Sequence, residues 1–101
     1  MADILIERSH ALGMERAREV AAQWQSEAKE EWGMECQYHA NEANEQGEVQ
    51  DRLTFERIGA QGSLCVSATQ LKMQLSLGFL MAPYKDRIEE KIAKNLDALL
   101  A

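Results

Sequence analysis

Five stretches of the chain alternate between apolar and polar residues, as expected of strands with one buried face. They cover residues 3–8, 34–39, 52–56, 63–68 and 71–79. In the last stretch, every second residue is apolar: Leu71, Met73, Leu75, Leu77 and Phe79. We expect a strand in each stretch.

Two connections between these strands have different patterns. Residues 59–62 have glycine at both ends and predict a hairpin turn. Residues 40–50 are polar and have no period, so they predict a mobile acidic loop.

Two other stretches repeat their apolar residues with the period of a helix. The first spans residues 14–32, has Trp24 and Trp32 as expected core anchors, and is followed by Gly33 as a stop signal. The second has Pro83 in its first turn, a position that proline suits. Its apolar stripe consists of Tyr84, Ile88, Ile92, Leu96 and Leu99.

The resulting order is strand, helix, four strands, helix. Because each strand and each helix has one apolar side, the economical arrangement is an α+β two-layer sandwich. We expect an antiparallel meander sheet with both helices on one face, in one domain that spans residues 1–101. This order is also that of the TATA-binding-protein-like and helix-grip folds, a likeness of architecture that carries no function.

Composition narrows the class of protein. Seventeen acidic and eleven basic residues give a net charge of −6, and the basic residues are scattered, which argues against a nucleic-acid partner. No stretch approaches the roughly 20 apolar residues of a membrane-spanning helix. The N-terminal apolar run is short, which predicts no signal peptide. We therefore expect a cytoplasmic protein whose two cysteines are reduced.

Candidate catalytic and metal-binding residues are few. Cys36 and His39 are three apart on a predicted strand, so they should lie on opposite faces and cannot form a nucleophile pair. Cys65 should lie on the polar face, where Arg52 or Lys72 on neighbouring strands would have to lower its pKa to make it reactive. His10 has no metal-ligand spacing to another histidine or cysteine. We expect no catalytic residues, no cofactor and no metal.

The most unusual segment is the predicted corner before the second helix. Residues 77–84 contain no charged side chain, and basic residues follow them. One interpretation is that this corner closes the end of the core. The other is an exposed apolar docking patch with a basic rim. Its candidate residues are Leu77, Phe79, Leu80, Met81, Tyr84 and Lys85.

Several segments are similar to a known bacterial family. They are DILIERSH at residues 3–10, the hairpin residues Leu53, Phe55, Arg57, Gly59, Gly62, Leu64 and Val66, and LGFLMAPYKDRIEEKI at residues 77–92. With these the chain resembles the polyhydroxyalkanoic acid system family, also called the polyhydroxyalkanoate granule-associated region family. It departs from that pattern at Tyr38, where tryptophan is expected. The family offers no catalytic residues to carry over.

The resemblance implies a bacterial accessory protein of polyhydroxyalkanoate storage. The first hypothesis is a non-enzymatic protein that binds the granule surface or a granule protein. The second is a small carrier of an acyl or other apolar ligand between the sheet and the last helix, which needs a cavity of roughly 300 Å³. The third is a structural homodimer that pairs through an edge strand or the open sheet face.

Overall fold

A computed structural model describes residues 2–43 and 47–100 of the chain. Its elements are β1 (Ala2–Ser9), α1 (Gly13–Trp32), β2 (Glu35–Ala43), β3 (Val49–Arg57), β4 (Ala60–Val66), β5 (Gln70–Leu77), the short 3₁₀ helix η1 (Ala82–Tyr84) and α2 (Lys85–Leu100). This confirms the predicted order β-α-β-β-β-β-α.

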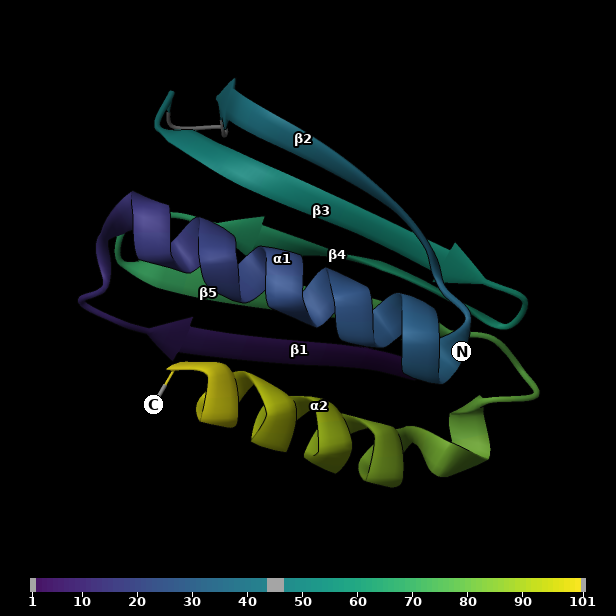
Figure 1. Ribbon diagram of the computed structural model, residues 1–101. Coiled ribbons are helices and arrows are strands. Elements are labelled where there is room, and N and C mark those ends of the chain that lie inside the picture. Colours follow the sequence, from purple (N-terminus) through teal and green to yellow (C-terminus); the bar gives the residue numbers. More distant parts are fainter. Residues whose placement is uncertain (1, 44–46, 101) are drawn as a thin grey trace.

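The strands form one sheet in the order β1-β5-β4-β3-β2, and every neighbouring pair is antiparallel. Strands β2 to β5 are the predicted meander, and β1 adds to its β5 edge. Both helices cover the same face of the sheet and run antiparallel to each other, with α2 on the β1 side (Figure 1). The structure therefore confirms the α+β class and its two layers.

Alternation along the strands places the apolar side chains between the sheet and the helices. Trp24 of α1 is 1% exposed, and its ring centroid lies 4.8 Å from that of Phe55 and 5.9 Å from that of Trp32. Gly33 ends α1 with a left-handed φ of 63°, as predicted. The strands and α2 supply most of the remaining core: Ile4, Ile6, Leu53, Leu64, Val66, Leu71, Met73, Leu75, Leu77, Ile92 and Leu96.

The predicted loop over residues 40–50 is wrong for most of its length. Strand β2 continues to Ala43 and pairs with β3 from Val49 onward, although a register shift interrupts the pairing between His39 and Glu42. Residues 44–46 of the predicted loop lie outside the described part of the chain. The bulge breaks the two-residue period, and this end of the edge strand is largely exposed, so no apolar alternation marks it.

The hairpin turn is also displaced from its predicted position. Its central residues are Ile58 and Gly59, and Arg57 pairs with Ala60. Gly59 has a left-handed φ of 88°. Gly62 lies within β4, where an added Cβ would clash with the Gln74 carbonyl oxygen. The second glycine therefore reflects a close approach of β5 rather than a turn.

Strand β5 ends at Leu77, two residues before the predicted end. The Gly78 N–H donates a hydrogen bond to the Gly59 carbonyl at 2.9 Å, and the Gly78 carbonyl accepts from the N–H groups of Met81 and Ala82. These bonds turn the chain into η1 and α2. Phe79 therefore leaves the buried face of the sheet, contrary to the strand pattern.

Replacing Gly59 by alanine tests how tightly the β3–β4 turn packs against the β5–α2 connection. The left-handed φ strains any side chain, and the new Cβ would lie 3.0 Å from Met81 Cγ. We expect Gly59→Ala to lower the free energy of unfolding by about 1–2 kcal/mol, measured by urea denaturation. The matched control is Gly78→Ala, whose Cβ would be 3.5 Å or more from its neighbours. It should change stability by about 0.5 kcal/mol or less, and equal losses for the two variants would contradict the fit.

Candidate functional site

Four large side chains with high exposure gather at one end of the molecule. Their exposed fractions are 91% for Ile58, 89% for Phe79, 74% for Leu80 and 53% for Tyr84. The β3–β4 turn and the β5–α2 connection that hold them lie at the same end, opposite the C-terminus (Figure 1). The hydrogen bond between Gly78 and Gly59 joins these two segments. We call Ile58, Phe79, Leu80 and Tyr84 the end patch.

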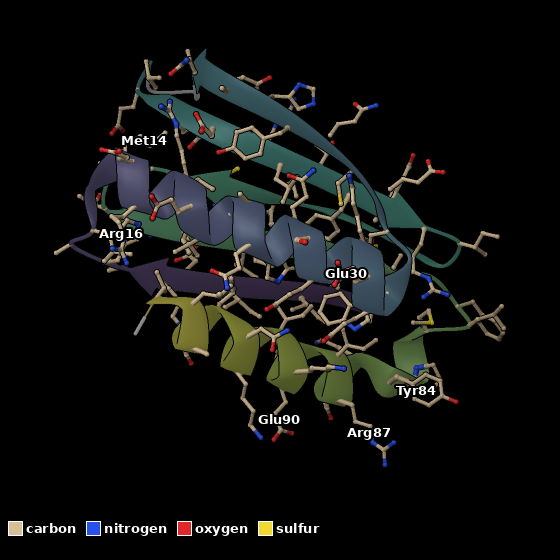
Figure 2. The ribbon with its side chains drawn as sticks, in the orientation of Figure 1. Met14, Arg16, Glu30, Tyr84, Arg87 and Glu90 are labelled. Carbon is tan, nitrogen blue, oxygen red and sulfur yellow. The ribbon has the colours of Figure 1, made fainter. Side chains whose placement is uncertain are left out.

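The predicted patch residues divide between surface and interior. Phe79, Leu80 and Tyr84 are exposed, whereas Met81 and Lys85 are half-buried and Met81 packs against the core. Leu77 is 1% exposed and lies in the core, so its assignment to a surface patch is wrong. The reason is that β5 ends there with its last side chain still on the helix-covered face. Figure 2 shows Tyr84 at the start of the C-terminal helix, at the opposite end of the molecule from Met14 and Arg16.

Ile58 belongs to the same surface and was not predicted from the sequence. It immediately precedes the glycine of the true turn, which places it at the tip of the hairpin. An apolar residue before a single turn glycine is the signal that would have found it. Placing the turn at residues 59–62 hid that signal.

Basic side chains lie near the end patch. The Arg57 Nη1 donates to the Trp32 carbonyl at 2.9 Å, and Arg57 has no ion-pair partner within residues 2–43 and 47–100. Lys91 Nζ lies 3.8 Å from Glu31 and 5.7 Å from the centroid of the Trp32 ring. Arg87 is an exposed residue of the first turn of α2, three residues after Tyr84 (Figure 2). The surface is therefore apolar with charged groups at its margin, which include the carboxylates Glu35 and Glu56 in the same hollow as Arg57 and Ile58.

A small apolar pocket opens beside the end patch, between the two helices and the sheet. Its volume is about 100 Å³, and its walls include Trp24, Phe55, Leu77, Met81 and Ile92. The carrier hypothesis places its ligand in this region and needs roughly 300 Å³. The pocket has no room for a long acyl chain.

The face of the sheet away from the helices is polar and hollowed. The hollow measures about 900 Å³, and Gln37, Thr54, Ser63 and Gln74 contribute to its lining. Leu5 is an apolar exception on this face and is 55% exposed. The homodimer hypothesis, with pairing through this face or an edge strand, stays a prediction.

One carboxylate is completely buried under the N-terminal half of α1. Asp51 of β3 is 0% exposed and accepts hydrogen bonds from Arg18 Nε at 2.7 Å, Arg18 Nη2 at 3.2 Å and the Asn41 backbone N–H at 3.0 Å. The Tyr38 hydroxyl donates a further hydrogen bond to it. Asp51 therefore joins α1, β2 and β3 through a single side chain.

Hydrogen bonding determines the protonation of this cluster. Burial raises the pKa of Asp51, but the hydrogen bonds from Arg18, Tyr38 and Asn41 outweigh burial and hold its pKa below the ordinary 3.8. Burial and the hydrogen bond to Asp51 raise the pKa of Tyr38. Because hydrogen bonds from other protein groups satisfy the carboxylate oxygens of Asp51, we interpret the cluster as a structural anchor for the β2–β3 hairpin.

The sequence contained a signal for this anchor. Asp51 has the same parity along its strand as Leu53 and Phe55, so it belongs to the buried face. A carboxylate in that position requires a cationic partner, which Arg18 supplies from the helix above.

Cys36, His39 and His10, which were considered as candidate reactive residues, have different surroundings. Cys36 packs against the core, where burial raises the pKa of its thiol more than nearby Lys29 lowers it. His39 Nδ1 is 3.9 Å from Glu42 and is separate from Cys36, as expected for opposite faces. His10 Nδ1 accepts the Leu12 N–H at 3.2 Å.

Cys65 lies between the two cations that the sequence predicted. Arg52 on β3 and Lys72 on β5 are its direct cross-strand neighbours. However, Arg52 Nε is 2.9 Å from Glu42 and Lys72 Nζ is 4.0 Å from Glu7, so both cations already face carboxylates.

Two further features of the described residues concern metal ions and membranes. Within that part of the chain, no three or more His, Cys, Asp or Glu residues lie in a group that could hold a metal ion. None of the helices there is both long and apolar enough to cross a membrane.

Replacing Asp51 by asparagine tests the anchor. The amide side chain would keep the shape but lose the charge, so we expect Asp51→Asn to lower the free energy of unfolding by about 2 kcal/mol at neutral pH. The control is Asp97→Asn, which removes an exposed partner of Arg8 and should cost about 0.5 kcal/mol or less. Equal losses for the two variants would contradict the anchoring role.

The same variant has a defined pH dependence. Because the pKa of Asp51 is lower in the folded chain than its ordinary 3.8, the unfolded chain binds a proton first as the pH falls. The stability that the carboxylate supplies is complete above the unfolded pKa and is lost as the pH falls through the folded pKa. Chemical denaturation at several pH values should therefore show the gap between wild type and Asp51→Asn narrowing below about pH 4.

The comparisons with known proteins agree with the resemblance seen in the sequence. The sequence profile of one family matches residues 4–100, and that family is described as "Putative polyhydroxyalkanoic acid system protein". No curated protein matches the chain, and no solved structure matches it. The likeness to the TATA-binding-protein-like and helix-grip folds therefore stays a prediction. Because the match covers almost the whole sequence, the chain belongs to the family of polyhydroxyalkanoic acid system proteins.

Proposed function

We propose that this protein is a non-enzymatic accessory protein of bacterial polyhydroxyalkanoate storage that associates with the granule surface in the cytoplasm. The family gives the polyhydroxyalkanoate context. The observation that carries the proposal is the exposure of Phe79 and Leu80, 89% and 74%, at a corner where Ile58 and Tyr84 are exposed too.

The end patch suits the chemistry of a solid aliphatic polyester. Removing the exposed parts of four large side chains from water supplies on the order of 5 kcal/mol. The ester carbonyls of such a polymer accept hydrogen bonds, and the donors near the patch include Arg57, Arg87 and the Tyr84 hydroxyl. A neutral polymer also does not repel a chain with a net charge of −6, unlike nucleic acid or an anionic membrane.

Two observations support a binding role rather than catalysis. Asp51, the buried carboxylate with a lowered pKa, is enclosed by Arg18, Tyr38 and Asn41. The pocket between the two helices and the sheet has about 100 Å³ and mainly apolar walls. Asp51 is 0% exposed, and no acidic residue, histidine or cysteine is among the described lining residues of that pocket.

The direct test is co-sedimentation of purified protein with polyhydroxyalkanoate granules. The triple variant Ile58→Ser, Phe79→Ser, Leu80→Ser removes most of the apolar area of the end patch and leaves half-buried Met81 in place. We expect its affinity for granules to fall at least about a hundredfold, which corresponds to about 3 kcal/mol of lost burial.

The matched control is the double variant Leu5→Ser, Val49→Ser, because both residues are exposed and apolar, at 55% and 60%, and lie outside the end patch. It should bind like wild type, and circular dichroism and thermal melting should show that both variants remain folded. If the folded triple variant binds like wild type, or if the control loses as much, the end patch is not the docking surface.

A second experiment distinguishes binding to the polymer from binding to the proteins that coat it. Bare polyester particles should bind the wild-type protein about as well as native granules. Binding to native granules alone would overturn the polymer contact and point to a granule protein as the partner.

A further inference from the structure

Beyond the docking role, we infer that the pocket between α1, α2 and the sheet is a binding site for a short aliphatic carboxylate with about four carbon atoms. Binding at this site would not require the granule. The size of the pocket, the chemistry of its walls and the charges among its lining residues indicate the ligand.

The size of the pocket limits the ligand. An apolar cavity of about 150 Å³ accommodates benzene, which has six carbon atoms. The volume here is about 100 Å³, so a chain of about four carbons fits. The walls that would contact this chain are aromatic or aliphatic, and they include Trp24, Phe55, Leu77, Met81 and Ile92.

Two cations complete the lining and favour a ligand with a negative charge. Arg57 comes from the end of β3 and Lys91 from α2, and no acidic residue lines the pocket with them. Both are exposed, whereas the apolar wall residues Trp24, Phe55, Leu77 and Ile92 are buried. A ligand with its chain among the apolar walls and its carboxylate toward these cations matches both parts of the pocket.

One hydrogen bond orients the arginine. Its Nη1 donates to the Trp32 carbonyl at 2.9 Å, and the remaining N–H groups have no carboxylate partner in the part of the chain that the structure describes. Guanidinium groups bind carboxylates through paired hydrogen bonds. Lys91 faces Glu31 at 3.8 Å, but that pair is exposed on both sides and is weak, so a ligand carboxylate competes with it readily.

Trp24 provides a reporter inside the site. It lines the pocket, and its buried indole N–H has no hydrogen-bond partner among the described residues. A ligand that enters the pocket changes the surroundings of this ring, so the indole N–H signal in an NMR spectrum should shift on binding.

The experiment is a titration of the protein followed by ¹H–¹⁵N NMR. Butyrate should shift the Trp24 indole signal with a dissociation constant on the order of 1 mM, a realistic value for six heavy atoms. Acetate has the charge without the chain, and 1-butanol has the chain without the charge. Each should bind at least about tenfold more weakly.

Variants locate the binding in this pocket. Ile88 is half-buried and lines the pocket, so Ile88→Phe fills it and should abolish the butyrate shift. Lys91→Met keeps most of the aliphatic stem and should weaken butyrate about fivefold while leaving 1-butanol unchanged. Its matched control is Arg87→Met, on the same helix but not in the pocket lining, which should bind like wild type.

Three results would overturn the inference. They are the absence of any shift at butyrate concentrations tenfold above the expected constant, equal affinities for butyrate and 1-butanol, and undiminished binding in a folded Ile88→Phe variant. The end-patch triple variant should bind butyrate normally because it leaves the pocket lining intact. The proposal of granule docking and the proposal of carboxylate binding are therefore tested independently.

Discussion

The end of the molecule that carries the proposed function depends on the contact between two glycines. The Gly78 N–H bonds to the Gly59 carbonyl at 2.9 Å, and Met81 lies close enough to Gly59 to touch any added Cβ. This contact fixes the tip of the β3–β4 hairpin against the corner that leads into α2. It thereby gathers the end patch on one surface, and it places Met81 at the wall of the apolar pocket. Glycine is needed at position 59 because the turn has a left-handed φ of 88° and because the neighbouring chain is so close.

Most of the fold could be predicted from the sequence because the covered face of the sheet requires apolar alternation. Strand β5 and helix α1 both follow their predicted periods over nearly their whole length. Prediction failed where that requirement ends. The far part of β2 is an exposed edge interrupted by a bulge, so its polar sequence was interpreted as a loop. Gly62 was assigned to the turn because a glycine needed for a close approach of strands looks the same in sequence as one needed for a turn.

The candidate site was predictable in part. A charge-free segment at a strand–helix corner indicated Phe79, Leu80 and Tyr84, which are exposed in the structure. The sequence could not show that Leu77 is still inside the core, since that depends on the residue at which β5 ends. Ile58 was missed because it joins the patch only through the packing of two segments about 20 residues apart. The anchor at Asp51 was missed for a similar reason, because its cationic partner Arg18 lies on a different element.

The most direct measurement of the central claim is hydroxyl-radical footprinting of the wild-type protein, free and bound to polyester particles. This method reads the solvent exposure of individual side chains, including those of the end patch. The account predicts that labelling of Phe79, Leu80, Tyr84 and Ile58 falls strongly on binding, whereas labelling of Leu5 on the open sheet face stays the same. Protection of Leu5 with the end patch still labelled would contradict the account and would place the contact on the open face of the sheet.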